Sequence, residues 1–558
     1  MDITIRIAGE AGQGVVALGE ILVGALSGAG LQVFTGKSYM SRVRGGLNWS
    51  DIRIGDCDLH GLKVRAELLA ALTPEALDVL RDDVSPGGII LCDSGNAGTA
   101  EVLAIDFSGI SNGICGSAIM ANTAAAGAIF ALLGYEPEPL KNYLQQVFAK
   151  KGDEIIQNNL KSATAGYSAA AEKKIKIAAP APGACRKEYL TSGAAAIGLS
   201  AAVAGVKLAS AYPMTPGTGT FTYLASVADK YGIVVEQAED EIAAVNMVCG
   251  AVYAGIPAMT MTSGGGFALM CEGLSLAGMM ELPIFILLAQ RPAPATGMPT
   301  RTAQEDLKFA VSAGHGEFPR AIYAPGTLQQ CYNLTRLAIE TAHRYQSPVI
   351  MLTDQYLQDV EKNIDPLDET YNPVERHLCS SNDPGYRRYE ITAGGVSPRA
   401  IPGGEALVVC DSDEHTAEGH LTEDFKVRIA MQNKRMAKNK GLLKEFVHPE
   451  YFGALNPKRT FICWGSTYGP CREAVELLNR EDSNAAAMLH FSQVWPLVPE
   501  ICRDFLKSAQ KIIVVEGNYT GQFASILKEQ GIIRDCQQIS RYDGLPFTAE
   551  YILMEVMK

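Results

Sequence analysis

Short apolar runs alternate with helix-length segments along most of the chain. At the N-terminal end, a β-branched run at 3–8 precedes a glycine turn at 9–14, an amphipathic helix pattern at 15–26 and a second strand pattern at 31–35. This order predicts a βαβ unit. The runs at 283–290 and 347–354 are apolar throughout, which is typical of parallel strands buried on both faces. The pattern as a whole predicts an α/β protein.

The remaining elements divide the chain into three α/β domains. A helix is predicted at 191–205, and further strands are predicted at 87–93, 232–236, 258–262, 406–410, 460–464, 487–490 and 511–516. A stretch rich in Lys, Ala and Pro at 173–183 reads as a linker, and a polar region containing proline at 364–404 marks a second boundary. We therefore expect domains at 1–175, 189–395 and 396–558, with a linker at 176–188.

Composition excludes several classes of protein. The 558 residues carry a formal net charge of −13, which disfavours a nucleic-acid-binding surface. No apolar stretch is long enough to predict a membrane span, and the first residues lack the pattern of a secretory signal, so we expect a cytoplasmic protein. The 13 cysteines include no CxxC pair, so neither a disulfide framework nor a metal site is expected in this chain.

The stretch at 234–256 is the most informative candidate site. A predicted strand leads into the acids Glu236, Glu239, Asp240 and Glu241, and a helix of small residues follows. One interpretation is a helix start whose dipole favours acids. The nine-residue spacing from Glu241 to Gly250, however, resembles the pyrimidine-binding motif of thiamine diphosphate enzymes. In those enzymes a glutamate hydrogen-bonds N1′ of the aminopyrimidine ring, which implies that Glu241 is catalytic and binds the cofactor.

Two further segments resemble the 2-oxoacid:ferredoxin oxidoreductases. The sequence YPMTP at 212–216 resembles their YPITP signature, and QRPAPATGMPT at 290–300 resembles their QRxxPSTGxPT segment, although Ala295 replaces a common serine. A proline-flanked loop is the alternative interpretation of the first segment. An arginine after a buried strand can hold a carboxylate with two parallel hydrogen bonds. The resemblance implies the following sites: Tyr212 and Pro213 for the cofactor, and Thr215, Arg291 and Thr300 for the 2-oxoacid.

Two glycine-rich segments add candidate binding residues. TSGGGF at 262–267 reads as a loop after a strand, whose Gly264 and Gly265 either bring backbone close to the cofactor or form a plain turn. GEAGQG at 9–14 and SRVRGG at 41–46 resemble the gamma domain of the same oxidoreductases, which that family associates with coenzyme A. A glycine turn before a helix presents free N–H groups to phosphate. The candidate coenzyme A residues are Gly12, Gln13, Gly14, Arg42 and Arg44; each arginine alternatively pairs with surface acids.

The last domain resembles the C-terminal, transketolase-like domain of the same large subunits. The matching segments lie at 413–420, 464–467, 518–522 and 542–547, and no chemistry is assigned to them. Within the first, His415 and His420 lie near acids, but no third ligand follows at helical spacing, so a hydrogen-bonded loop is expected rather than a metal site. The resemblance to a large alpha subunit with a fused gamma domain thus extends over nearly the whole chain.

The resemblance implies an enzyme that is active only with a partner. The reaction would convert a 2-oxoacid, coenzyme A and oxidised ferredoxin into an acyl-coenzyme A, CO₂ and reduced ferredoxin, with 2-oxoglutarate favoured over pyruvate or branched-chain 2-oxoacids. A GDG motif followed by a suitable asparagine is missing. The diphosphate site, Mg²⁺ and 4Fe–4S clusters are therefore expected in a smaller beta subunit, within a dimer of heterodimers. A non-oxidative thiamine diphosphate enzyme and a regulatory or scaffold subunit are the alternatives.

Overall fold

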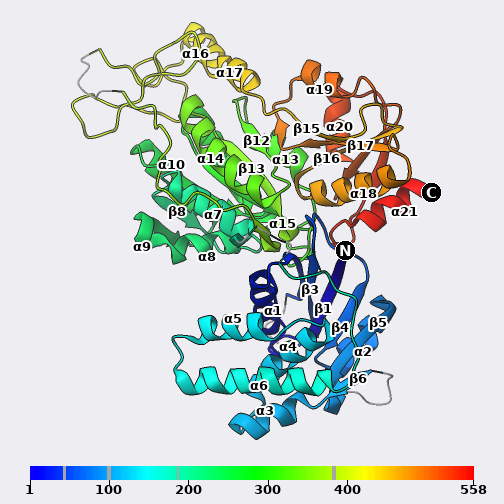
Figure 1. Ribbon diagram of the computed structural model, residues 1–558. Helices are drawn as coiled ribbons and strands as arrows, with labels where there is room; N and C mark the ends of the chain where they lie inside the picture. The colour runs from blue at the N-terminus through cyan, green and yellow to red at the C-terminus, as the bar shows by residue number, and fades with distance from the viewer. Residues whose placement is uncertain (42–44, 97–101, 184, 186, 188, 380–384) are drawn as a thin grey trace. The chain divides into compact units, whose positions relative to one another are not determined.

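The computed structural model describes residues 1–41, 45–96, 102–183, 185, 187, 189–379 and 385–558. The chain forms two compact units (Figure 1). The first contains Met1–Thr191, Val360–Pro366 and Thr548–Tyr551, and the second contains Ser192–Asp359, Leu367–Phe547 and Ile552–Lys558. In the described residues, no helix combines the length and the apolar character needed to cross a bilayer.

The first unit is built on an eight-stranded sheet. Its strands, in spatial order, are β6 (Leu103–Ile105), β5 (Val84–Asp93), β4 (Ala66–Ala71), β1 (Asp2–Glu10), β3 (Leu47–Gly55), β2 (Gln32–Ser38), β14 (Glu361–Ile364) and β7 (Tyr189–Ser192). The antiparallel β3 lies between β1 and β2, so the predicted βαβ strands are not neighbours as the pattern suggested. The sequence pattern missed β3 and β4.

Helices cover both faces of this sheet. They are α1 (Val15–Gly28), α2 (Pro74–Leu80), α3 (Phe107–Cys115), α4 (Ala121–Leu132), α5 (Glu138–Phe148) and α6 (Asp153–Ala171), with 3-10 turns η1 (Arg81–Asp83), η2 (Ser94–Asn96) and η3 (Ala118–Met120). Because strand side chains alternate, Ile5 and Ile7 of β1 pack with the helices α1, α4 and α5, whereas Ala8 packs with α2. Figure 1 shows α4 and α6 side by side.

The second unit holds the seven-stranded sheet that carries the candidate site. Its order is β18 (Gln493–Trp495), β12 (Ala321–Tyr323), β13 (Val349–Asp354), β11 (Phe285–Gln290), β10 (Ala258–Thr262), β8 (Leu208–Ala211) and β9 (Val234–Gln237). All neighbours are parallel except β18, which is antiparallel to β12. The fully apolar runs predicted as buried strands are confirmed as β11 and β13.

The helices around this sheet follow its strands in the chain. They are α7 (Gly193–Val203), α8 (Thr218–Ser226), α9 (Ala228–Tyr231), α10 (Glu241–Tyr253), α11 (Gly264–Leu269), α12 (Cys271–Met279), α13 (Leu307–Ser312), α14 (Leu328–Tyr345) and α15 (Gln355–Asp359). The predicted helix at 191–205 is therefore confirmed as α7. The glycines of the segment predicted as a loop at 262–267 instead begin α11.

A five-stranded sheet completes the second unit. Its order is β15 (Glu450–Gly453), β17 (Ala486–Phe491), β16 (Arg459–Trp464), β19 (Ile512–Glu516) and β20 (Gln537–Ser540). The accompanying helices are α16 (Phe425–Ala437), α17 (Asn439–Lys444), η4 (Gly465–Thr467), α18 (Tyr468–Glu481), α19 (Pro499–Phe505) and α20 (Gln522–Glu529). The last helix, α21 (Ala549–Met557), has residues in both units. One hydrophobic core joins both sheets, since Ile286 and Leu288 belong to the same buried cluster as Ile462 and Val514.

The expected α/β architecture is confirmed, with one strand prediction wrong. Residues 406–410 form no strand, and Ala406 is the only one of them that is buried. Leu407 is 78% exposed, and the segment has no neighbouring strand to supply hydrogen bonds. An apolar run without a pairing partner remains irregular, whatever its strand propensity.

Candidate active site

Four neighbouring parallel strands bring the candidate residues to one edge of the seven-stranded sheet. Tyr212 follows β8, Glu241 begins the helix after β9, Gly264 follows β10, and Arg291 follows β11. These strands lie side by side in the order β11, β10, β8 and β9. The carboxyl ends of parallel strands share one edge, which is where open α/β sheets bind ligands.

Glu241 is a buried acid with a free oxygen. Its residue is only 3% exposed, and Oε1 is buried without a hydrogen-bond partner in the described part of the chain. The neighbouring Asp240 caps α10 by accepting a hydrogen bond from the N–H of Ala243 at 2.7 Å. The two acids therefore differ: Asp240 stabilises the helix, whereas Glu241 keeps an unused acceptor, which is costly without a ligand.

Gly266 makes room for that acceptor. A Cβ atom at this position would lie 2.5 Å from Oε1 of Glu241 and 2.1 Å from Oγ1 of Thr262. Only glycine fits so close to the carboxylate. A flat ring with an N–H donor fits the chemistry of this cradle, because a charge-assisted hydrogen bond would satisfy the buried oxygen. The donor set thus suits the aminopyrimidine part of thiamine diphosphate.

Arg291 is a buried cation at the same edge. Its residue is 9% exposed, and Nη1 donates a 2.8 Å hydrogen bond to the carbonyl oxygen of Thr215. Among the described residues, no carboxylate lies within ion-pair distance of this guanidinium, and burial lowers its pKa. A buried guanidinium without a salt bridge can bind the carboxylate of a ligand. The structure thus brings Thr215 and Arg291 together.

The other predicted residues lie at the rim. Tyr212 is 41% exposed, Pro213 and Thr300 are half-buried, and Gly265 is exposed. The loop after Arg291 folds back on itself, with the N–H of Met298 donating to the carbonyl of Pro292 at 3.1 Å. Because these residues are more exposed than Glu241 and Arg291, burial does not mark them as a site, and their roles stay predictions.

Asp306 is a second buried acid that sequence reasoning missed. Its residue is 7% exposed, and Oδ2 is buried without a hydrogen-bond partner among the described residues. A Cβ on Gly264 would lie 2.5 Å from Oδ1 and 2.6 Å from Oδ2 of this carboxyl group. Burial, helped by Glu305 and opposed by Arg291, raises the pKa of Asp306 to about 6. Nothing in the local sequence distinguishes it from an ordinary helix-start acid.

Comparisons with known proteins agree with this geometry. The family model "Pyruvate flavodoxin/ferredoxin oxidoreductase, thiamine diP-bdg" matches residues 200–434, and "Pyruvate ferredoxin/flavodoxin oxidoreductase" matches residues 4–169. The 2-oxoglutarate synthase subunit KorA of Archaeoglobus fulgidus is 30% identical over 63% of this chain and 92% of its own length. The chain belongs to the 2-oxoacid:ferredoxin oxidoreductase alpha-subunit family.

Two further relatives support the same family. Subunit alpha of 2-oxoacid:ferredoxin oxidoreductase 1 from Sulfurisphaera tokodaii is 35% identical over 67% of this chain, and the match spans 62% of that relative's length. The structure of 2-oxoglutarate:ferredoxin oxidoreductase from Magnetococcus marinus, with 2-oxoglutarate, coenzyme A and succinyl-CoA bound, superposes with a TM-score of 0.92. It is 32% identical and covers 100% of this chain and 99% of its own.

In this family member, residues that follow strands of the five-stranded sheet, or end one, hold the segment before Asp306 in place. The side chain of Gln304 makes two of these contacts. Its Nε2 donates to the carbonyl of Trp464 at 2.8 Å, and its Oε1 accepts from the N–H of Gly517 at 2.8 Å. Asn518 Nδ2 donates to the carbonyl of Gln304 at 3.0 Å. The segments that resembled the family without an assigned chemistry therefore fix the chain just before Asp306.

The histidines of the 413–420 segment lie in a hydrogen-bonded loop. Nδ1 of His415 lies 2.9 Å from the carbonyl of Asp413, and the ring stacks on Tyr389 at 3.9 Å between centroids. The N–H of Thr416 donates to the carbonyl of His420 at 2.8 Å. Among the described residues, no three potential metal ligands gather anywhere. The hydrogen bonds of His415 and Thr416 are those of the loop expected for this segment.

In the first unit, the glycine turn faces a cavity of about 660 Å³. Gly12 and Gly14 have φ values of +95° and +82°, which favour glycine. Gln13 lies between them, lines the cavity, and accepts a 3.3 Å hydrogen bond from Asn122 on its carbonyl oxygen. Arg42 and Arg44 lie outside the described residues.

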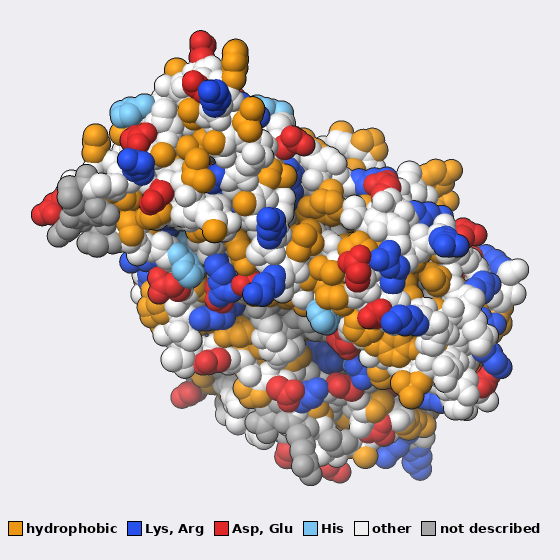
Figure 2. Space-filling model, turned by 90° about the horizontal axis from the view of Figure 1, so that it is seen from above, with side chains coloured by type: hydrophobic (Ala, Val, Ile, Leu, Met, Phe, Trp, Pro, Cys, Tyr) orange, Lys and Arg blue, Asp and Glu red, His pale blue; other side chains and the backbone are white. Residues whose placement is uncertain are grey.

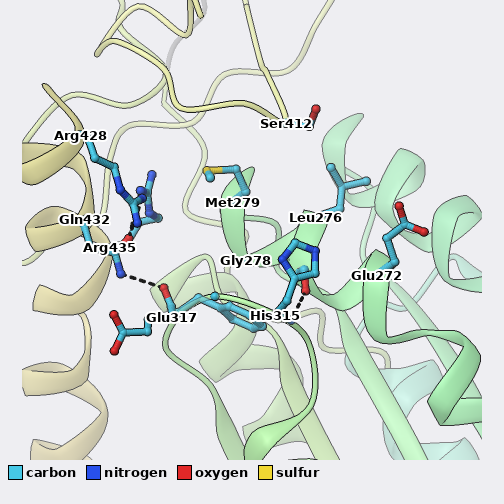
Figure 3. Close-up of a pocket in the computed structure, with 13 residues that line it drawn as sticks. Glu272, Leu276, Gly278, Met279, His315, Glu317, Ser412, Arg428, Gln432 and Arg435 are labelled. Carbon is cyan, nitrogen blue, oxygen red and sulfur yellow. Dashed lines mark hydrogen bonds between the residues drawn. The ribbon is translucent and has the colours of Figure 1, made fainter. Parts of the chain in front are cut away.

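A second cavity, of about 300 Å³, is not the candidate site. Figure 3 shows its polar side chains, among them Arg428, Arg435 and Gln432, and none of the predicted residues lines it. Both arginines pair with Glu414, at 2.6 and 2.7 Å, so this one carboxylate offsets only one of their two positive charges. On the face drawn in Figure 2, the described acidic and basic side chains are intermingled, without a continuous basic stripe.

Proposed function

We propose that the chain is the alpha subunit of a 2-oxoacid:ferredoxin oxidoreductase that uses thiamine diphosphate and oxidises 2-oxoglutarate with coenzyme A. The observation that carries the proposal is the pairing of a buried, unsatisfied carboxylate with a buried, unpaired guanidinium at one strand-end edge. The carboxylate of Glu241 suits a protonated ring nitrogen, and the guanidinium of Arg291 suits the carboxylate of an oxoacid. Family membership supports the same assignment.

Glu241 would hold the aminopyrimidine ring of the cofactor. Its free Oε1 lies beside Gly266, where a flat ring can approach. The carboxylate would keep a proton on N1′ of the ring, and the buried surroundings would strengthen that bond. When bound, thiamine diphosphate supplies the electron sink that allows a 2-oxoacid to lose CO₂. Gly264 and Gly265 would let the backbone lie close to the ring.

Arg291 would position the substrate. Its Nη1 is fixed by the carbonyl of Thr215, so the rest of the guanidinium can receive a carboxylate without losing further freedom. Thr300 and the Thr215 segment would complete this end of the pocket. The choice of 2-oxoglutarate is supported by the relatives named for it, whereas pyruvate and branched-chain 2-oxoacids present the same head group.

The first unit would bind coenzyme A, and a partner subunit would complete the enzyme. The turn at Gly12, Gln13 and Gly14 precedes a 14-residue helix, whose first N–H groups can bind a phosphate, and Gln13 lines a cavity. The relatives are named as alpha subunits. We expect a beta subunit with the diphosphate site, Mg²⁺ and 4Fe–4S clusters, ferredoxin as acceptor, a dimer of heterodimers and a cytoplasmic location.

Glu241→Gln in the complex with its partner tests the assignment. Gln cannot supply the carboxylate that keeps the ring nitrogen protonated, so we expect coenzyme A-dependent reduction of ferredoxin by 2-oxoglutarate to fall at least about a hundredfold. Glu239→Gln is the matched control, since Glu239 is exposed in the same stretch. The control should retain activity.

Several results would change the assignment. Near-normal turnover of the Glu241→Gln complex would contradict the cofactor role. Release of CO₂ from the wild-type complex without reduction of ferredoxin would favour the non-oxidative alternative. A complex that turns over pyruvate faster than 2-oxoglutarate would correct the substrate but keep the reaction class.

A further inference from the structure

Two buried acids lie beside the glycines that begin α11. Among the described residues, the buried carboxylate oxygens without a hydrogen-bond partner belong to Glu241, Glu281 and Asp306. Glu281 is neutralised by an ion pair with Lys438. Glu241 and Asp306 remain, and they lie against Gly266 and Gly264, two residues apart at the start of α11. Both unsatisfied acids therefore lie close to the first turn of the same helix.

The backbone at Asp306 is fixed by hydrogen bonds, whereas one oxygen of its side chain receives none. The N–H of Asp306 donates to Oε1 of Gln290 at 3.0 Å, and Gln304, two residues earlier, is tied to Trp464 and Gly517. Oδ2 of Asp306 has no hydrogen-bond partner among the described residues. The residue is only 7% exposed, and a buried acceptor left without a partner by the protein suits a ligand.

The charges around Asp306 are few. Glu305 directly precedes Asp306, and Arg291 faces it from the end of β11. Glu241 lies on the other side of the first turn of α11. The facing helix α20 contributes the uncharged Gln522, whose Nε2 donates to the carbonyl of Glu305. Lys308 is turned outward to Glu529 on the surface. Of these described groups, Arg291 is thus the cation that favours loss of the proton from Asp306.

Substrate binding changes this balance. A 2-oxoacid whose carboxylate occupies Arg291 would cancel the positive charge that favours ionised Asp306, and would add a negative charge beside it. A negative charge added beside a buried carboxyl group disfavours the ionised form of that group. In the complex Asp306 would then hold a proton, and a protonated carboxyl group is a hydrogen-bond donor.

We propose that Asp306 binds the 2-oxoacid as a neutral carboxylic acid, donating a hydrogen bond to the substrate while Arg291 holds the substrate carboxylate. The inference rests on the proposed function. No covalent step is involved: one proton is taken from solvent as the oxoacid binds, and it returns on release. Glu241 serves the cofactor and Asp306 serves the substrate, so the first turn of α11 separates two carboxyl groups with different tasks.

The expected signature is a dependence of substrate affinity on pH. Burial raises the pKa of Asp306 to about 6, so the free enzyme at pH 7 to 8 is mostly in the wrong ionisation state. In the wild-type complex, a rise in KM should lower kcat/KM for 2-oxoglutarate by up to about tenfold between pH 7 and pH 8. Asp306→Asn keeps the shape and removes the ionisation, so its kcat/KM should gain up to about tenfold relative to wild type over that interval.

Asp504→Asn is the matched control. Its carboxylate lies on the surface of the second unit, 2.8 Å from Lys507, with 66% of the side chain exposed. Its pH profile should follow that of the wild type. An Asp306→Asn profile that is lower than wild type by a constant factor at every pH would overturn the proposal, because a purely structural role would produce that result. If Asp306→Asn does not assemble with the partner, Asp306→Ser tests the same loss of ionisation.

Calorimetry provides a readout that does not depend on turnover. Binding of 2-oxoglutarate to the complex without thiamine diphosphate, measured at pH 7.5 in phosphate and in Tris buffer, should take up close to one proton per site in the wild type and none in Asp306→Asn. Equal uptake in both proteins would refute the proposal. A wild-type complex that neither binds nor oxidises any 2-oxoacid would refute the proposed function, and the inference with it.

Discussion

The buried ion cluster around Glu281 supports the second unit, and its removal has a size that can be worked out. Glu281 contacts Lys434 at 2.5 Å and also pairs with Lys438, and the side chains of all three are at most 1% exposed. Breaking a buried ion pair leaves uncompensated charge and costs roughly 3–5 kcal/mol. We therefore expect Glu281→Gln to lower the free energy of unfolding of this unit by about that amount.

The pKa values give a second, independent magnitude. Burial acts to raise the pKa of Glu281, but the neighbouring cations outweigh it and lower the pKa from an ordinary value of 4.5 to about 2. A shift of this size corresponds to about 3 kcal/mol, at 1.4 kcal/mol per unit. Because the folded-state value is depressed, this stability is present above pH 4.5 and is lost as the pH falls towards 2. Burial also lowers the pKa of Lys438 to about 8, so the pair does not fully repay the desolvation of the lysine.

Urea denaturation followed by tryptophan fluorescence measures the effect. Trp49 is the tryptophan of the first unit, so a Trp49→Phe background leaves Trp464 and Trp495 to report on the second unit. The matched control is Glu369→Gln, which removes an exposed pair with Lys230 and should cost at most about 1 kcal/mol.

Two outcomes would refute this reasoning. One is an equal loss of stability in Glu281→Gln and Glu369→Gln, which would mean that burial does not strengthen the cluster. The other concerns the double variant Glu281→Gln with Lys438→Met. Removing the unpaired lysine should recover part of the lost stability, and no recovery would show that the cost does not arise from a stranded charge.

Two further variants test the positioning of the substrate. Arg291→Lys should raise KM for 2-oxoglutarate roughly 10- to 100-fold in steady-state assays, because a lysine cannot form two parallel bonds to a carboxylate; an unchanged KM would place the substrate elsewhere. Gln304→Ala should lower the unfolding free energy by about 2–5 kcal/mol in urea titrations and raise the same KM, since it strands the Trp464 carbonyl and the Gly517 N–H. Loss of stability with an unchanged KM would limit Gln304 to a structural role.

Site residues that come directly after a predicted strand can be located from the sequence. The apolar runs that form β10 and β11 are locally unambiguous, so the pattern alone places Gly264 and Arg291 at strand ends. Glu241 stands out by spacing alone, and the fold adds the buried, unpaired Oε1 that distinguishes it from its neighbour Asp240. Local pattern is sufficient for such residues because a parallel sheet brings strand ends together.

Features that depend on distant partners were not predictable. The strand β3 enters the first sheet between β1 and β2, which only the pairing register reveals. The run at 406–410 has strand propensity but no neighbour, so it stays irregular. Asp306 also depends on distant partners, since the fold places it against Gly264 and buries it. The local sequence shows only an acid before a six-residue helix, which does not predict that burial.

The five-stranded sheet contributes to the site by position rather than by chemistry. Gln304 bonds to Trp464 and Gly517, which lie 160 and 213 residues further along the chain, and the N–H of Thr302 donates to the carbonyl of Gly544. Trp464 and Gly544 belong to segments that resembled the family without a recognisable function, and Gly517 directly precedes another of these segments. Their common target is the short segment that ends at Asp306. A segment that fixes another by backbone contacts must keep its backbone geometry but needs no reactive side chain, which explains why these segments carry no recognisable catalytic motif.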